Sequence, residues 1–158
     1  MKLAAVKEQD ANKYAGYLSQ IINANNGCKD AVIQLGAVIL RRNISVNVTD
    51  TSDLMNQENN ANLWERLTDE TRDFVKAQII ESLNNGVSVK RETMRKVCDL
   101  AVEVQGGMQE YQDDAIWQDL LNLVFSFVND EMESKVDAGL KIFTGLFSYI
   151  TEHLQAHT

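Results

Sequence analysis

Apolar side chains recur at every third or fourth position in the first part of the chain, which is the spacing of helices that bury one side. Residues 14–22 and 28–44 carry two such stripes, and Gly27 is placed as the stop between them. The stripes consist of Tyr14, Tyr17, Leu18, Ile21 and Ile22, and then of Ala31, Val32, Leu35, Val38 and Ile39. We therefore predict an antiparallel helix pair over residues 10–44.

Residues 45–62 interrupt this pattern with five asparagines and few large apolar side chains, so we expect a mobile Asn-rich surface loop. The pattern then returns in a second predicted helix pair over residues 63–105, with Asn62 as a candidate N-cap. Its two stripes are Trp64, Leu67, Thr71, Phe74, Val75, Ile79 and Leu83, and then Met94, Val97, Cys98, Ala101 and Val104. Gly106 and Gly107 are expected to end the second helix.

A third pair is predicted over residues 114–151, with a turn at residues 129–133. Its stripes are Ile116, Trp117, Leu120, Leu121, Val124, Phe127 and Val128, and then Val136, Leu140, Phe143, Phe147 and Ile150. The last helix is also apolar at Ile142, Leu146 and Tyr149, so it must be covered on two sides, which indicates that a further repeat normally follows. Four aromatic side chains on the first helices of the second and third pairs are expected to stack in the core: Trp64, Phe74, Trp117 and Phe127.

The three predicted pairs are spaced like repeats. Gly36, Val97 and Ala138, the small residues aligned in the second helix of each pair, are separated by 61 and 41 residues. If the loop contributes about 20 residues, both steps are near 41, within the range of roughly 40 to 47 for HEAT and armadillo repeats. The expected fold is therefore all-α, a HEAT-repeat α-solenoid of about three antiparallel helix pairs in a right-handed superhelix, with residues 1–158 as one segment. An ordinary six-helix bundle is the alternative, because repeats this irregular do not exclude it.

The composition agrees with a folded helical protein in a reducing compartment. The chain has 158 residues, of which 44% are hydrophobic, and no proline, a residue that helix interiors exclude. Cys28 and Cys98 have no CxxC spacing, which argues against a disulfide framework and against a zinc site. No apolar run approaches the roughly 20 residues of a membrane-spanning helix, so we expect no membrane association.

The net charge of -8 is unevenly distributed along the chain. Residues 1–98 hold 13 basic and 12 acidic side chains, whereas residues 99–158 hold 2 basic and 11 acidic ones. Such a field repels nucleic acid and anionic lipid, and it attracts basic partners within about a Debye length. An alternative of equal weight is that the surplus carboxylates only keep the protein soluble.

The sequence contains no arrangement typical of an enzyme. It has no glycine-rich phosphate loop, no GxSxG and no HExxH motif. His153 and His157 have a spacing that holds metals on helices, but no third ligand accompanies them, and we interpret them as part of the tail. We expect no catalytic residues, no metal and no cofactor.

Three segments resemble a known family. Residues 37–42 (AVILRR), 94–101 (MRKVCDLA) and 139–143 (GLKIF), in this order and spacing, are similar to the N-terminal HEAT repeats of the importin-beta superfamily, and within it to the importin five (karyopherin beta three) branch. The resemblance covers roughly residues 12–151. Family members are several-fold longer, so it implies an excerpt in which residues 1–9 are the remnant of a preceding repeat. The Asn-rich loop is longer than the family's usual connection.

The resemblance implies a nuclear transport receptor that binds the GTPase Ran in its GTP form, cargo with basic localisation signals, and phenylalanine-glycine nucleoporins. It also implies a location in cytoplasm, nucleus and nuclear pore. The inner helices would be residues 28–44, 88–105 and 133–151. The residues assigned to Ran are Arg41, Arg42, Arg91, Arg95, Asp99 and Glu103, and those of an acidic cargo face are Glu131, Glu133 and Asp137.

Simpler interpretations of these residues stay open. Arg91, Arg95 and Asp99 are spaced as i, i+4 pairs on a solvated helix, where each pair contributes only a few tenths of a kcal/mol. Glu131 and Glu133 equally suit the first turn of a helix, where the dipole favours acids. For the whole chain, the alternative to transport is a HEAT scaffold for protein complexes without a Ran switch, and a small helical enzyme is a third possibility.

Overall fold

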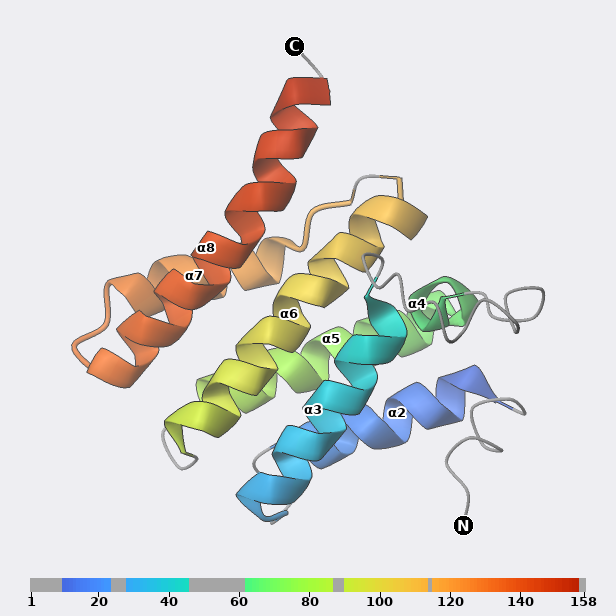
Figure 1. The fold of residues 1–158 in the computed structure, drawn as a ribbon, viewed down its shortest axis with the longest axis horizontal. Helices are drawn as coiled ribbons and strands as arrows, with labels where there is room; N and C mark the ends of the chain where they lie inside the picture. Colours follow the sequence, from blue (N-terminus) through green and yellow to red (C-terminus); the bar gives the residue numbers. More distant parts are fainter. Residues whose placement is uncertain (1–9, 24–27, 46–61, 87–89, 114, 157–158) are drawn as a thin grey trace.

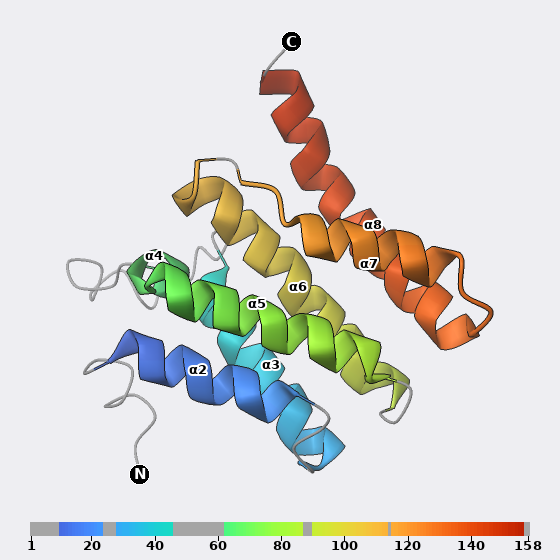
Figure 2. The ribbon, with the colours of Figure 1, turned by 180° about the vertical axis from the view of Figure 1, so that it is seen from behind.

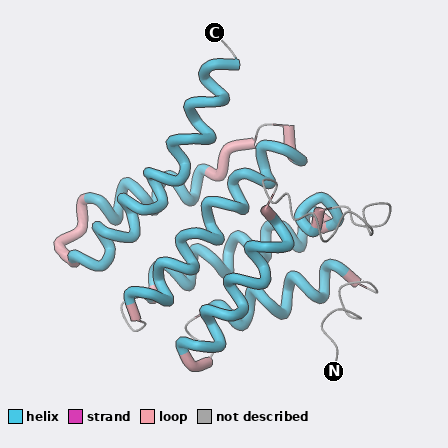
Figure 3. The backbone as a smooth tube through the Cα atoms, in the orientation of Figure 1, coloured by secondary structure: helices cyan, strands magenta, loops and turns pink. Residues whose placement is uncertain are grey.

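The computed structural model describes residues 10–23, 28–45, 62–86, 90–113 and 115–156. In these residues the chain forms helices and no strand, which confirms the all-α prediction (Figure 3). The helices are α2 (Ala11–Ile22), α3 (Asp30–Ile44), α4 (Leu63–Arg66), α5 (Asp69–Asn84), α6 (Arg91–Tyr111), α7 (Gln118–Val128) and α8 (Glu133–Ala156). The predictions for residues 1–9, for the Asn-rich loop at 46–61, for Gly27 and for His157 lie outside the described residues.

The helices lie in two layers. Helices α3, α6 and α8 lie side by side in one layer, and α2, α5 and α7 form the other, as the two opposite views show (Figures 1 and 2). Each helix of one layer packs against its sequence neighbour in the other, so that α2 pairs with α3, α5 with α6 and α7 with α8. The core fills the space between the layers.

Polar contacts give the register between neighbouring pairs. In the first two pairs, Ser82 Oγ donates to the Ile22 carbonyl at 2.7 Å and Gln34 Nε2 to Thr93 Oγ1 at 2.9 Å, over sequence separations of 60 and 59 residues. Between α6 and α8, Arg91 contacts Asp137 over a separation of 46 residues. Because each pair is matched to the next by a nearly constant offset, neighbouring helices of a layer run in the same direction.

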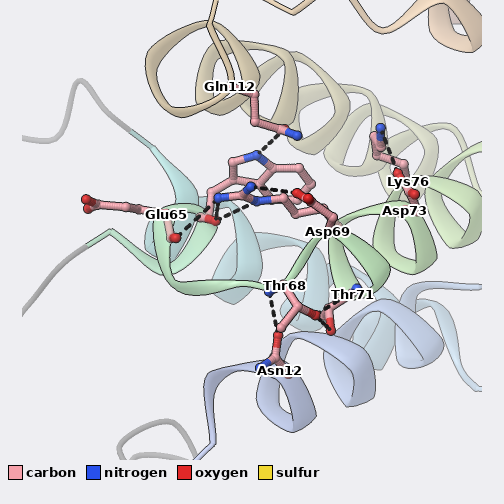
Figure 4. Close-up of polar contacts among 10 residues, drawn as sticks. Asn12, Glu65, Thr68, Asp69, Thr71, Asp73, Lys76 and Gln112 are labelled. Carbon is pink, nitrogen blue, oxygen red and sulfur yellow. Dashed lines mark hydrogen bonds and ion pairs between the residues drawn. The ribbon is translucent and has the colours of Figure 1, made fainter.

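The prediction of one uninterrupted helix after residue 63 is wrong, because the chain breaks between α4 and α5. Leu67 and Thr68 are extended, with ψ of 145° and 158°. The Thr68 side chain accepts the Thr71 N–H at 3.3 Å and caps α5, while the Thr68 N–H donates to Asn12 Oδ1 of α2 at 2.9 Å (Figure 4). The predicted N-cap Asn62 is confirmed at α4, where its side chain accepts the Trp64 N–H.

Arg72 holds the two pieces together. Its Nε and Nη2 donate to the Trp64 carbonyl at 3.1 and 3.0 Å, and Nη2 also donates to the Glu65 carbonyl at 3.2 Å. The Trp64 carbonyl also accepts the Leu67 N–H at 3.3 Å, so Arg72 adds side-chain donors at the end of α4, where a helix leaves carbonyl groups short of partners. The Trp64 ring is fully buried, and its Nε1 donates to Gln112 Oε1 at 2.9 Å.

The predicted end of α6 at Gly106 and Gly107 is also wrong, because the helix continues to Tyr111. Both glycines are buried at close contacts between helices. A Cβ atom on Gly107 would lie 3.1 Å from the Trp64 ring, and one on Gly106 would lie 2.8 Å from Tyr149 Oη. These glycines permit close approach rather than ending the helix.

The predicted stripe of α6 is confirmed, since all five of its apolar residues are buried. The stripes predicted for α3 and α8 are wrong, because none of their residues whose side chains the structure describes is buried. In α3 the buried residues are Ile33, Gly36, Ala37, Leu40 and Ile44, and Val32 and Leu35 are exposed. In α8 the buried residues are Ala138, Gly139, Ile142 and Leu146, whereas Leu140, Phe143 and Phe147 are exposed.

Of the other residues expected in the core, some are buried and some are exposed. Trp64, Trp117 and Phe127 are buried as predicted, but Phe74 is 38% exposed and Ile116 and Tyr17 are exposed more strongly. Phe74 lies in the layer of α2, α5 and α7, on the side of α5 turned away from the buried Val75 and Ile79. The helical spacing of its neighbours placed it in the core, and the tertiary packing leaves it outside.

Candidate protein-binding surface

A row of charged residues runs along the side of α6 that the core does not cover. Arg91, Arg95, Asp99 and Glu103 follow one another at intervals of four residues, so they project from one side of the helix. Arg91 and Arg95 are exposed, and Asp99 and Glu103 are half-buried. The structure brings Arg41 of α3 to one flank of this row, and Asp137 and Lys141 of α8 to the other. We call these seven residues the mixed-charge face.

Ion pairs across helices connect the mixed-charge face. Asp99 lies between two cations, with Lys141 Nζ at 3.2 Å from Oδ1 and Arg41 Nη1 at 3.8 Å from Oδ2. Arg41 Nε also lies 3.6 Å from Glu103 Oε1, and Arg91 pairs with Asp137. The predicted alternative of pairs within α6 is therefore not what the structure has, because the described partners of this row come from α3 and α8.

These pairs are weak contributors to folding. Most of the groups are partly exposed, and such pairs contribute about 0 to 1 kcal/mol each. Glu103 differs, because its Oε2 is buried and has no hydrogen-bond partner in the part of the chain that the structure describes. Breaking these weak ion pairs costs little free energy. Their charged groups are therefore available to pair with charges of a binding partner.

Arg95 and Arg42 are the two assigned cations that have no ion-pair partner among the described residues. Arg95 lies within the row, between Arg91 and Asp99. Arg42 lies on another side of α3, seven residues after Leu35, and so it shares the stripe of that exposed leucine and not the side of Arg41. The structure thus brings five of the six residues assigned to Ran together and separates Arg42 from them.

A cleft of about 470 Å³ opens between α6 and α8 beside this row. Its charged lining comprises Arg91, Arg95, Lys141, Glu133 and Asp137, and its floor includes Met94 and Cys98. Three cations and two carboxylates give it a mixed charge.

The three acids assigned to cargo do not form a free acidic cluster. Asp137 pairs with Arg91, Glu133 lies at the cleft, and Glu131 is exposed in the turn before α8. In the same turn, the backbone N–H of Met132 donates to Asp130 at 2.8 Å and holds the pKa of that carboxyl below its usual value. Lys141 was missed by the sequence analysis, although its position four residues after Asp137 is a signal that it shares the same side of α8.

Cys98 is the buried one of the two cysteines. Burial, and to a smaller extent the neighbouring Asp99 carboxylate, raise the pKa of the Cys98 thiol to about 12, so the thiol stays protonated near neutral pH. In the described ranges, no three His, Cys, Asp or Glu side chains are grouped as metal ligands would be. None of the helices in the described part of the chain is long and apolar enough to span a membrane.

Comparisons with known proteins do not identify a family. No protein-family model, no curated protein and no solved structure matches this chain.

Proposed function

We propose that this chain is a HEAT-type solenoid segment that binds another protein through the mixed-charge face. The repeat architecture is supported by the register between pairs. The second pair is offset from the third by 46 residues at Arg91 and Asp137 and by 40 at Cys98 and Ala138, close to the length of HEAT and armadillo repeats. The offset near 60 between the first two pairs includes the long connection at residues 46–61.

The observation that carries the binding proposal is the continuity of the mixed-charge face over three parallel helices. Stacked helix pairs present one row of helices as a shared surface, and such surfaces bind partner proteins. Here α3, α6 and α8 contribute charges that are exposed or half-buried, weakly paired and connected to a cleft. Charged faces of this kind contribute to specificity and association rate more than to folding.

The partner that we propose is Ran in its GTP form, in an N-terminal segment of a nuclear transport receptor. This rests on the resemblance of residues 37–42, 94–101 and 139–143 to importin-beta proteins, and on the position of Arg41, Arg91, Arg95, Asp99 and Glu103 on one face. Cargo with basic signals and phenylalanine-glycine nucleoporins would be further partners, at the cytoplasm, nucleus and pore. A constitutive scaffold that binds a different protein through the same face is the alternative.

Retention of the chain on immobilised Ran distinguishes these proposals. A receptor segment is expected to be retained by Ran loaded with a non-hydrolysable GTP analogue and not by Ran with GDP. Arg95→Glu should weaken this retention about tenfold or more, because it reverses a cation that lacks an internal ion pair. Lys13→Glu on α2 makes the same charge change outside the mixed-charge face and should leave retention unchanged.

A charge swap gives a second control. Arg91→Glu alone breaks the pair with Asp137, whereas Arg91→Glu combined with Asp137→Arg restores it with reversed polarity. If binding needs the cation at position 91, both variants bind weakly; if it needs only the folded face, the double variant binds normally. If the chain is retained equally by Ran in both nucleotide states, or by neither, the Ran assignment is rejected and the scaffold proposal remains. If the Arg95→Glu variant binds every partner normally, the mixed-charge face is not the binding surface.

A further inference from the structure

A second pocket opens in the layer of α3, α6 and α8 (Figure 1). It has a volume of about 500 Å³ and lies further along α6 than the cleft beside Arg95. Its charged lining consists of Arg41, Asp99, Glu103 and Lys141, and Val102 and Tyr149 supply apolar surface. We call it the Glu103 pocket.

The Glu103 carboxylate is the unusual group in this pocket, because it is mostly buried and lacks hydrogen bonds. The Glu103 side chain is 13% exposed. Its Oε2 atom is buried, and no described residue donates a hydrogen bond to it. The Arg41 Nε atom lies 3.6 Å from the other oxygen, Oε1, which is beyond hydrogen-bond distance. Such a carboxylate destabilises the folded chain, since it has lost water and has gained no donor in exchange.

The neighbouring charges pair Glu103 less closely than Asp99. The Lys141 Nζ atom lies 3.2 Å from Asp99 Oδ1, so Asp99 already has a close cation. The Arg41 guanidinium lies 3.8 Å from Asp99 and 3.6 Å from Glu103, and its side chain is 44% exposed. Because it is held by no hydrogen bond to either carboxylate, Arg41 can turn toward solvent at little cost and leave Glu103 open.

The pocket suits an organic cation with an apolar stem. The charges of Arg41 and Lys141 repel a divalent metal ion, which would need several oxygen ligands. Val102 and Tyr149 offer apolar surface to a chain of methylene groups. A guanidinium is less hydrated than an ammonium and donates two parallel hydrogen bonds to one carboxylate. An arginine side chain therefore fits a mostly buried carboxylate better than a lysine side chain does.

We propose that the Glu103 pocket binds an arginine side chain of the partner protein, whose guanidinium replaces Arg41 at the Glu103 carboxylate. This proposal rests on the proposed function, because it specifies what the bound protein presents to the mixed-charge face. The arginine supplies the hydrogen-bond donors that the carboxylate lacks in the folded chain. The unfavourable burial of Glu103 in the free protein thus becomes a favourable contribution to binding.

An NMR titration tests the pocket without a partner protein. The probe is a capped tripeptide with arginine between two glycines, and the backbone amide signals of Val102, Glu103 and Gly145 are expected to shift in a saturable way. The same tripeptide with citrulline has the shape of arginine without its charge. It should bind at least about tenfold more weakly, because it loses the charge-assisted hydrogen bonds. Equal binding of both peptides, or no shift at these amides, would overturn the proposal.

Two substitutions test the roles of the carboxylate and of Arg41. Glu103→Gln keeps the shape of the side chain and removes its charge, so it should lower the affinity for the arginine tripeptide to that of the citrulline tripeptide for the wild type. Arg41→Gln removes the competing cation and should tighten binding about threefold or more. Glu110→Gln is the matched control, because Glu110 is exposed on the same helix and lies outside the pocket. Unchanged binding by Glu103→Gln, or weaker binding by Arg41→Gln, would reject the proposal.

Thermal melting separates a binding group from a structural one. Glu103→Gln should melt at the temperature of the wild type or above it, since a buried charge without a donor is removed. If it melts clearly below Glu110→Gln, the carboxylate stabilises the fold and the proposal is wrong.

The result is also separate from the Ran assignment. If Arg95→Glu loses retention on Ran but the wild type binds no arginine tripeptide, only the Glu103 pocket is rejected. If the tripeptide binds and Ran does not, only Ran is rejected.

Discussion

Cys98 is the residue whose chemistry the fold changes most. It lies on α6 beneath α8, where burial, helped by the Asp99 carboxylate, raises the pKa of its thiol to about 12. In the unfolded chain the ordinary value of 9.0 applies, so the folded state binds this proton more tightly. The resulting stabilisation is complete below pH 9 and is lost as the pH rises from 9 toward 12.

We expect the free energy of unfolding to fall in this range by about 1.4 kcal/mol per pH unit from this group. Tyr14 and Tyr111 also have raised pKa values and titrate in the alkaline range. The measurement is therefore the difference between the wild type and Cys98→Ala in urea unfolding at several pH values. The gap between the two should shrink as the pH rises above 9. Parallel pH profiles would show that the thiol is not insulated from solvent.

At the scale of the element, α6 is one helix of 21 residues that passes through two glycines. Glycine costs about 1 kcal/mol in a helix interior relative to alanine, and the close contacts of Gly106 and Gly107 with neighbouring rings explain why it is used here. The break between α4 and α5 has the opposite origin. There the Thr68 cap and the hydrogen bonds from Arg72 to backbone carbonyls stabilise an interruption that the spacing of apolar residues does not predict.

Alanine substitution of two glycines tests this account of α6. Gly107→Ala should lower the free energy of unfolding by about 1 to 2 kcal/mol, because Trp64 is buried, hydrogen-bonded to Gln112 and unable to move away from the new methyl group. Gly16→Ala on α2 is the matched control. No atom lies within 4 Å of its new Cβ, so it should raise stability by about 0.5 to 1 kcal/mol. Chemical denaturation measures both, and a stabilising Gly107→Ala would contradict the packing role.

At the scale of the molecule, each helix pair packs mainly on the next along the chain. Among the described helices, α6 alone has extensive contacts with helices of all three pairs, since α3, α5 and α8 all pack against it. In the proposed solenoid, stability derives from contacts between neighbouring pairs, so the terminal pairs are expected to open more easily than the central one. The exposed apolar residues of α3 and α8 follow from the same arrangement, because these helices have a neighbour in their layer on one side only.

Native-state hydrogen exchange should resolve this gradient. We expect amides of residues 97–104 in α6 to exchange only through global unfolding. Amides of α7 and of the second half of α8 should exchange through smaller openings, with weaker dependence on denaturant. Uniform protection of α6 and α8 in dilute solution would show that the chain unfolds as one unit.

The periodic spacing of apolar residues was enough to predict an all-helical chain, the ends of several helices and the buried side of α6. It succeeded for α6 because that helix has neighbours on both sides and its only apolar stripe faces the core. The same spacing placed Arg91, Arg95, Asp99 and Glu103 on one side of that helix, since four residues make about one helical turn.

Tertiary contacts decided what spacing left ambiguous. In α3 and α8 two apolar stripes compete, and either lowers the free energy when covered, so only the position of the neighbouring helices selects Ile33 and Leu40 over Val32 and Leu35. The ion-pair partners of α6 likewise lie about 40 to 60 positions away in the sequence. Helical spacing relates only residues a few positions apart, so it does not predict these pairs. Long-range packing therefore determined which apolar surfaces stay open and which charges meet.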